Sequence, residues 1–251
     1  MMNNPGNAPT SRFLHDAGLK RGMRILEIGC ANGLLTRELA GIVGKKGHVR
    51  GVDSDEMRLE EARNQTAEPD HAPIIYEHAD LARSLPEWEP FDAIVGRRIL
   101  MYLPDAGETV RRLTALLKPG GLMVFQEHSQ AGAPFAAQPI PLHEQAHDWM
   151  WRTIAAEKGT TTMGLDLPKL FEQAGLSIDH YRAEAILLGS GRDQGIEDLA
   201  RYMVDRVIAS GAADRDTVQP DSLAERLAEE RGLASSIVWD MAYLIGGRKP
   251  D

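Results

Sequence analysis

One stretch of the chain, residues 24–39, constrains the fold more than any other. It reads RILEIGCANGLLTREL: an apolar run, then small residues, then a helical pattern. Glu27 lies near the end of the apolar run, and Gly29, Ala31 and Gly33 follow it. In α/β folds, a strand that leads into a helix through small residues brings backbone N–H groups up to a ligand. The stretch therefore predicts a buried strand, a tight turn and a helix start, although the same pattern alone also fits a turn that binds nothing.

Apolar runs alternate with helical patterns along most of the chain. Strands of this length that alternate with helices indicate βαβ units and a mainly parallel sheet, with helices on both faces. We expect strands at 24–29, 48–53, 73–80, 91–96, 122–128, 177–189 and 235–247, and helices at 12–19, 33–43, 54–65, 106–118, 143–151, 167–174, 196–210 and 222–231.

The length of 251 residues fits one large α/β domain with modest insertions. We expect a flexible tail at 1–10 and a single domain at 11–251. Its core is expected at about 20–130 and 166–251, where the alternation is clear. Lid or insert elements are expected at about 129–165 and 190–232, where the rhythm changes.

The composition of the chain excludes some kinds of partner and indicates a cellular compartment. The net charge of −9 argues against a nucleic acid as the main partner, because phosphate binding needs clustered Lys and Arg. The single cysteine, Cys30, excludes an internal disulfide and a cysteine zinc cluster. No apolar run approaches membrane-spanning length, and the polar first residues do not resemble a secretory signal. We therefore expect a cytoplasmic protein without a membrane partner.

The pattern Glu27-x-Gly29-x-Ala31-x-Gly33 resembles the first motif of class I S-adenosylmethionine-dependent methyltransferases. A dinucleotide fingerprint would need a third glycine at position 34, which is Leu34. The resemblance implies an α/β, doubly wound, Rossmann-like fold with a seven-stranded, mostly parallel sheet, one antiparallel strand near the C-terminus and small helical lid insertions. It implies S-adenosyl-L-methionine as cofactor and S-adenosyl-L-homocysteine as product. Ala31 and Asn32 replace the commoner Gly-Thr or Gly-Ser, and both still fit a close turn.

Asp53 ends the second expected strand, twenty residues after Gly33. A carboxylate at this place can accept hydrogen bonds from both hydroxyls of a ribose. An aspartate that caps the next helix is the alternative. Ser54 and Met57, which follow Asp53 in the sequence, are expected beside the cofactor as well, with Met57 against adenine. A helix methionine is more often core filler.

Further landmarks follow in the family's order. Asp80-Leu81 follows the third strand. In relatives, an acidic side chain at this place accepts a hydrogen bond from the adenine amino group, and the backbone of its neighbour contacts the ring. The alternative is an ordinary aspartate in a turn. The segment 91–105 resembles the family's fourth strand and short helix. It places Arg97 near the methionine part of the cofactor and Tyr102 where many relatives carry a histidine that faces the transferred methyl group.

His128 ends the fifth expected strand and is the best-placed candidate for a general base, although a solvent-bonded histidine is the simpler interpretation. His143 and His147 share a helix face at i, i+4 spacing, but the H-E-x-x-H pattern of a zinc site is absent. We therefore expect no metal. These two histidines either line an acceptor pocket or belong to an ordinary packing helix.

These observations favour an enzyme that transfers a methyl group to an oxygen, nitrogen or carbon atom of a small metabolite. The alternatives are a non-catalytic S-adenosylmethionine-binding protein and, less favoured, a nicotinamide-dependent oxidoreductase. The expected partner is a small-molecule acceptor, and the insert helices could also form a homodimer contact. The identity of the acceptor does not follow from the sequence.

Overall fold

The computed structural model describes residues 5–66, 68–83, 85–132, 134–189 and 195–251. These residues form two compact units. The sheet unit contains residues 10–127, 164–182 and 244–251, and the insert unit contains the described residues within 1–9, 128–163 and 183–243. No helix among the described residues is long and apolar enough to cross a membrane.

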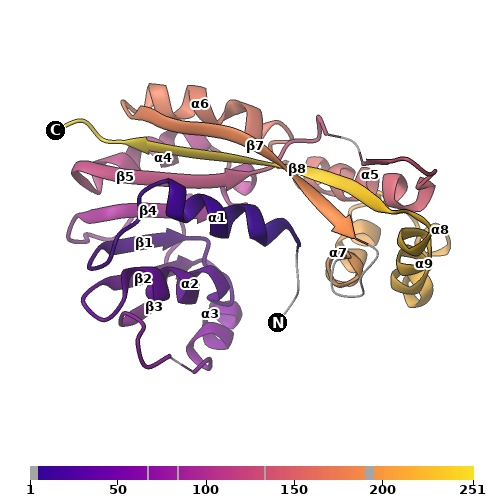
Figure 1. Cartoon of the computed structure of the whole chain (residues 1–251), viewed down its shortest axis with the longest axis horizontal. Coiled ribbons are helices and arrows are strands. Elements are labelled where there is room, and N and C mark those ends of the chain that lie inside the picture. The colour runs from indigo at the N-terminus through magenta and orange to yellow at the C-terminus, as the bar shows by residue number, and fades with distance from the viewer. Residues whose placement is uncertain (1–4, 67, 84, 133, 190–194) are drawn as a thin grey trace. The chain divides into compact units, whose positions relative to one another are not determined.

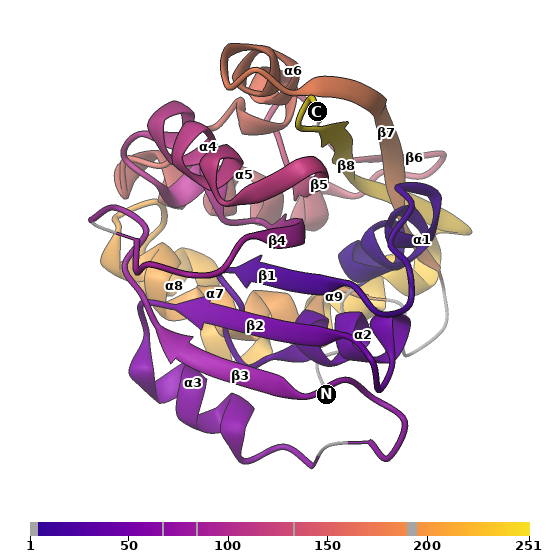
Figure 2. The ribbon, with the colours of Figure 1, turned by 90° about the vertical axis from the view of Figure 1, so that its left-hand side faces the viewer.

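The strands form one sheet in the order β3-β2-β1-β4-β5-β8-β6, and β7 also pairs with β8. The ladders that join β1 with β2, β1 with β4, β2 with β3 and β4 with β5 are parallel, and β6 is antiparallel to β8. Figure 2 shows β3, β2, β1 and β4 side by side. The strands are β1 Arg24–Ile28, β2 His48–Asp53, β3 Ile74–His78, β4 Phe91–Arg97, β5 Leu117–Glu127, β6 Phe135–Ala136, β7 Ser177–Gly189 and β8 Ser236–Arg248.

The strand order makes the end of β1 a switch point, because β2 lies on one side of β1 and β4 on the other. In open α/β sheets, ligands bind at the carboxyl ends of the strands at such a point. The prediction of a doubly wound, mostly parallel sheet with an antiparallel strand near the C-terminus is confirmed. The additional strand is β6, a two-residue strand within a segment where neither a strand nor a helix was expected.

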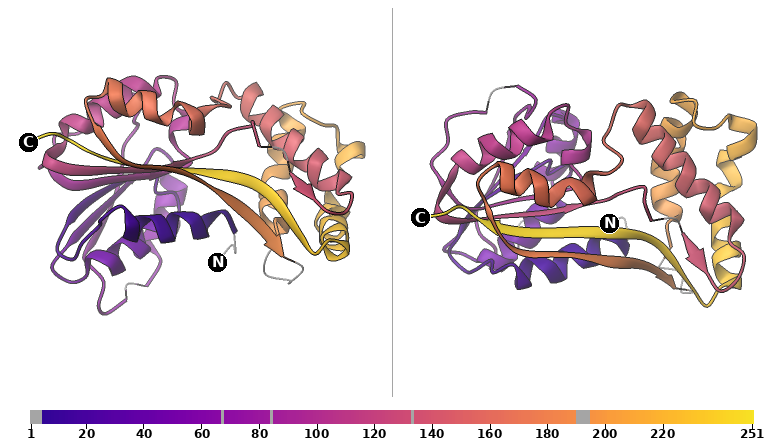
Figure 3. Two further views of the ribbon diagram at one scale, coloured as in Figure 1. Left: turned by 45° about the horizontal axis from the view of Figure 1, so that its top comes forward. Right: turned by 90° about the horizontal axis from the view of Figure 1, so that it is seen from above.

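Helices cover both faces of the sheet in the sheet unit (Figure 1). On one face lie α1, α2 and α3, and on the other lie α4 and α6 (Figure 3). Ile25 and Val95 pack with Leu39 of α2 and Phe13 of α1 in one core. The helices are α1 Ala8–Asp16, α2 Leu34–Val43, α3 Glu56–Arg63, α4 Ala106–Ala115 and α6 Met163–Gln173.

The insert unit has a hydrophobic core of its own, which includes Trp149, Leu188, Val207, Leu227 and Trp239. Most of the expected insert ranges, 129–165 and 190–232, fall in this unit, and residues 190–194 lie outside the described residues. That these elements act as a lid stays a prediction. The helices of this unit are α5 Pro141–Ala156, α7 Glu197–Ala209, α8 Arg215–Val218 and α9 Pro220–Leu233.

Two element boundaries differ from the sequence prediction for clear physical reasons. α6 begins at Met163, so Pro168 lies inside the helix, where it has no N–H to donate. The carbonyl oxygen of Gly164, four residues earlier, accepts a hydrogen bond from the Tyr181 hydroxyl at 3.0 Å instead. The usual cost of an internal proline is thereby reduced.

β5 begins at Leu117 instead of residue 122, because a register shift absorbs the glycine-rich segment. Leu117 pairs with Phe91, and Leu122 then pairs with Ala93. Gly120 lies between them with a φ of +66°. At the other end of the chain, α1 begins at Ala8, so residues 8–10 are helical where a flexible tail was expected, and residues 1–4 lie outside the described residues.

Candidate functional site

The turn after β1 has an unusual backbone. Gly29, Ala31 and Gly33 have φ values of +66°, +46° and +73°. Ala31 is not a glycine, and a left-handed conformation is unfavourable for an alanine. Its N–H donates a hydrogen bond of 2.8 Å to Oδ2 of Asp53. The carboxylate at the end of β2 therefore holds the turn after β1 in its strained form.

The two glycines of the turn make room for side chains of the same unit. A Cβ atom on Gly29 would lie 2.7 Å from Cδ1 of Ile99, and a Cβ on Gly33 would collide with the ring and hydroxyl of Tyr76. Small residues at these positions let the backbone approach a ligand. The structure adds a second reason, which is packing against the loop after β4 and against β3.

Asp53 is not the helix cap that the alternative interpretation proposes. Asp55 caps α3, because its side chain accepts hydrogen bonds from the N–H groups of Met57 and Arg58. Met57 is 73% exposed, so it is not core filler either. Ser54 is exposed, and its carbonyl oxygen bonds with the His78 ring. The roles of Asp53, Ser54 and Met57 in binding a cofactor stay predictions.

Two ionisable side chains close to the turn, those of Glu27 and Arg97, lack the usual partners. Glu27 is 2% exposed, and its Oε2 atom has no hydrogen-bond partner among the described residues. Burial raises the pKa of Glu27 to about 8, although Thr36 and the charge of Arg97 act in the opposite direction. Arg97 pairs with Gln126 in the ladder between β4 and β5, but its side chain makes no hydrogen bond or ion pair with the part of the chain that the structure describes. Leaving these two side chains without partners lowers the stability of the folded protein.

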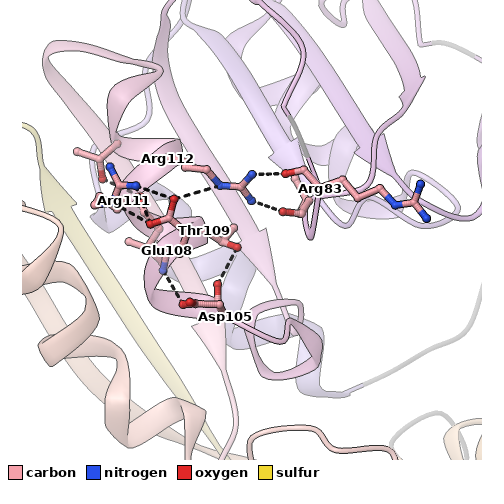
Figure 4. A network of polar contacts seen from close by, with 9 residues as sticks. Arg83, Asp105, Glu108, Thr109, Arg111 and Arg112 are labelled. Carbon is pink, nitrogen blue, oxygen red and sulfur yellow. Dashed lines mark hydrogen bonds and ion pairs between the residues drawn. The ribbon is translucent and has the colours of Figure 1, made fainter.

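The loop after β3 is held in place from α4. Oδ1 of Asp80 accepts the N–H of Ala82 at 3.0 Å, and Leu81 is buried. The guanidinium group of Arg112 donates hydrogen bonds to the carbonyl oxygens of Leu81 and Arg83, as Figure 4 shows for Arg83. Arg112 therefore fixes the backbone of the segment that carries Asp80 and Leu81.

The loop after β4 is fixed by a buried carboxyl group at the end of β5. Oε1 of Glu127 accepts the N–H groups of Ile99 and Leu100 at 2.9 and 2.8 Å. Burial raises the pKa of Glu127 to about 7, although these hydrogen bonds lower it. Tyr102 lies on the short 3-10 helix Leu100–Tyr102 and is 43% exposed. Its side chain is therefore accessible at the site, and its catalytic role stays a prediction.

His128 directly follows β5 and belongs to the insert unit. It is 8% exposed, and its Nδ1 atom lies 2.9 Å from Oδ2 of Asp240. The interpretation of His128 as an ordinary solvent-bonded histidine is therefore wrong, because its bonding partner is a buried carboxylate.

The two helix histidines have separate partners. Nδ1 of His143 lies 2.7 Å from Oε2 of Glu230, whereas Nε2 of His147 accepts the indole N–H of Trp151 at 3.0 Å. No cluster of three His, Cys, Asp or Glu side chains able to hold a metal ion is found within the described residues.

The site thus brings together most of the predicted cofactor residues in the sheet unit. Glu27, Gly29, Ala31, Asn32 and Gly33 lie in or beside one turn, with Asp53 bonded to it. Glu127, Arg112 and Asp240 are functional candidates that the sequence patterns do not reveal directly. An acidic residue within an apolar strand is the signal that could have revealed Glu127 and Asp240, and Arg112 has no comparable signal.

The sequence matches a family model described as a methyltransferase domain over residues 7–181. The chain belongs to this methyltransferase family. The resemblance to class I S-adenosylmethionine-dependent methyltransferases is confirmed.

Curated relatives include demethylmenaquinone methyltransferases of Staphylococcus aureus. One, from strain MRSA252, is 33% identical over 133 residues, which cover 53% of this chain and 54% of the relative. Another, from strain JH9, is 28% identical over 180 residues, which cover 65% of this chain and 72% of the relative. The chain thus matches about half the length of the first of these methyltransferases.

Solved structures share the fold. An S-adenosylmethionine-dependent methyltransferase from Mesorhizobium loti aligns with a TM-score of 0.57 at 21% identity, covering 99% of this chain and 100% of that one. Phosphoethanolamine N-methyltransferase 2 of Haemonchus contortus, in complex with S-adenosyl-L-methionine, aligns with a TM-score of 0.59 at 16% identity. That alignment covers 98% of this chain and 53% of the other. At these identities the likeness establishes the fold.

Proposed function

We propose that this methyltransferase transfers a methyl group from S-adenosyl-L-methionine to an oxygen, nitrogen or carbon atom of a small metabolite by in-line displacement. The observation that supports it most is the pair of unsatisfied groups beside the turn, Glu27 and Arg97. The amino-acid end of the cofactor has an ammonium and a carboxylate group. A buried carboxyl with an unpartnered oxygen and a guanidinium without an ion pair fit those two charges.

The remaining roles follow the ends of the strands. Asp53 would hold the ribose, Met57 and Leu81 would contact the adenine ring, and Asp80 would accept its amino group. Ser54, Gly29, Ala31, Asn32 and Gly33 would line the binding turn. When bound, the cofactor supplies an electrophilic methyl group, and its sulfur takes the electrons of the broken carbon–sulfur bond. The protein then has to position the acceptor and exclude water.

His128 would act as the general base for an acceptor that must lose a proton, and Tyr102 would contact the acceptor. A base contributes to catalysis only when the nucleophile carries a proton, as a hydroxyl does. The curated relatives are named for demethylmenaquinone, so the reduced form of that molecule is a natural first acceptor to test. We further propose a cytoplasmic location and a homodimer through helices of the insert unit.

Transfer of a labelled methyl group tests the proposal. The purified protein would be incubated with S-adenosylmethionine labelled in its methyl group and with reduced demethylmenaquinone, simple phenols or primary amines. We expect label in at least one acceptor and a strong loss of transfer in Asp53→Ala. The matched control is Asp70→Ala, because Asp70 is exposed and pairs only with Lys45 among the described residues. Cofactor binding without transfer to any acceptor would favour a non-catalytic binding protein.

A further inference from the structure

Asp240 is a buried carboxylate in the middle of an apolar strand. β8 reads SIVWDMAYLIGGR, and Asp240 is 7% exposed. Burial of a carboxylate is costly unless hydrogen bonds and opposite charges satisfy it. An apolar side chain would fill this position in the strand at lower cost, so the partners of Asp240 should explain its presence.

Asp240 lies beside two imidazoles and one backbone N–H group. Oδ2 lies 2.9 Å from Nδ1 of His128, and Oδ1 lies 3.8 Å from Nε2 of His147. Oδ1 also accepts the N–H of Met241 at 2.7 Å. Burial raises the pKa of Asp240, but contacts that stabilise the anion, of which the hydrogen bond with His128 is the largest, bring the pKa below its usual range. Asp240 is therefore an anion at neutral pH.

The hydrogen bonds distinguish the two histidines. Nε2 of His147 accepts the indole N–H of Trp151, and an indole nitrogen is only a donor. Nε2 of His147 is thus the unprotonated nitrogen, so it has no proton to give to Asp240, in agreement with their separation of 3.8 Å. An ionised carboxylate accepts only, so the proton in the contact of 2.9 Å belongs to Nδ1 of His128.

We infer that Asp240 is a positioning residue that holds His128 in the tautomer with a proton on Nδ1 and the basic lone pair on Nε2. This inference rests on the proposed function, in which His128 is the base. A carboxylate on one imidazole nitrogen fixes both the ring orientation and the tautomer, and it stabilises the imidazolium that forms when the base takes a proton.

One proton moves in this step, from the acceptor to His128. The acceptor hydroxyl loses its proton to Nε2 of His128, and the electron pair of that O–H bond becomes available for the new bond to the methyl carbon. His128 then carries a positive charge beside Asp240 and later releases the proton to solvent. The acceptor class that this arrangement fits is a small molecule with an acidic hydroxyl, such as a phenol or a hydroquinone.

The test has one readout that needs no acceptor. Two-dimensional ¹H–¹⁵N spectra that report two-bond couplings show which nitrogen of a histidine is protonated. The His128 signals would be assigned by their loss in His128→Gln. We expect an Nδ1–H tautomer in the wild type and a mixture or an Nε2–H tautomer in Asp240→Asn. The matched control is Asp205→Asn, an exposed aspartate on α7 of the same unit, which should leave the His128 signals unchanged.

The second readout is kinetic and uses reduced demethylmenaquinone or the phenol methylated most rapidly. We expect kcat of Asp240→Asn to fall on the order of 100-fold or more, with KM and the Kd for S-adenosylhomocysteine changed less than threefold. The double variant His128→Gln/Asp240→Asn should be no slower than the slower single variant, because the two residues act as one unit. Additive losses would indicate a merely structural role for Asp240.

Three results would each overturn a different part of the proposal. An Nε2–H tautomer in the wild-type protein overturns the inference, and this measurement remains possible if Asp240→Asn does not fold. A tautomer change without a loss in kcat overturns the catalytic part. A panel without any methyl transfer overturns the proposed function and with it the catalytic part, while the wild-type tautomer still decides whether Asp240 orients His128.

Discussion

Replacement of Glu27 by glutamine should change how the stability of the unliganded protein depends on pH. Burial raises the pKa of Glu27 from an ordinary value of 4.5 to about 8. Between these values the folded protein binds more protons than the unfolded chain, so the free energy of unfolding falls as the pH rises. A folded pKa of about 8 implies a loss of about 2 kcal/mol between pH 6 and pH 8 from this residue alone. Glutamine keeps the shape of the side chain and removes this loss.

Chemical denaturation of the wild type and Glu27→Gln from pH 5 to pH 9 would measure the effect. Glu127 also has a raised pKa, but both proteins contain it, so the difference between the two curves isolates Glu27. The variant should gain stability relative to the wild type as the pH rises through 6 to 8. Parallel curves over this range would refute the assignment of a buried, largely protonated carboxyl group.

Three further changes test the site. Asp53→Ala should weaken binding of S-adenosylhomocysteine by about 1–3 kcal/mol in calorimetry, because charge-assisted hydrogen bonds are lost, and unchanged affinity would place the ribose elsewhere. Arg112→Met should weaken binding of S-adenosylhomocysteine by about 1–3 kcal/mol, because the carbonyl oxygens of the loop that carries Asp80 and Leu81 lose their donor. The control Arg111→Met changes an exposed arginine and should bind as the wild type does. Gly33→Ala should lower the free energy of unfolding by about 1–3 kcal/mol, since the position is left-handed and packs against Tyr76; an unchanged denaturation midpoint would contradict this.

The parts of the fold that the sequence predicts well are those set by local patterns. The strands at 48–53 and 177–189 have the predicted bounds, and the predicted tight turn lies between Gly29 and Gly33, where the backbone is left-handed. Apolar runs and glycine spacing are local signals, and they suffice for these elements. The start of α6 was missed because Pro168 suggests a helix beginning, while a distant tyrosine hydroxyl bonds the carbonyl oxygen that the proline leaves without a donor.

The parts of the site that the sequence does not predict depend on contacts between distant residues. Asp240 is 112 residues from His128, and Arg112 is 31 residues from Leu81. Neither pair leaves a spacing pattern in a single sequence. The sequence predicted His128 as a candidate base from its place after a strand, but the carboxylate that orients it becomes visible only when β8 is placed.

A calorimetric titration of the purified protein with S-adenosylhomocysteine, and separately with NAD, tests most directly whether the turn after β1 binds a sulfonium cofactor. We expect saturable binding of S-adenosylhomocysteine at one site and no heat of binding with NAD. Binding of NAD without binding of S-adenosylhomocysteine would contradict this expectation.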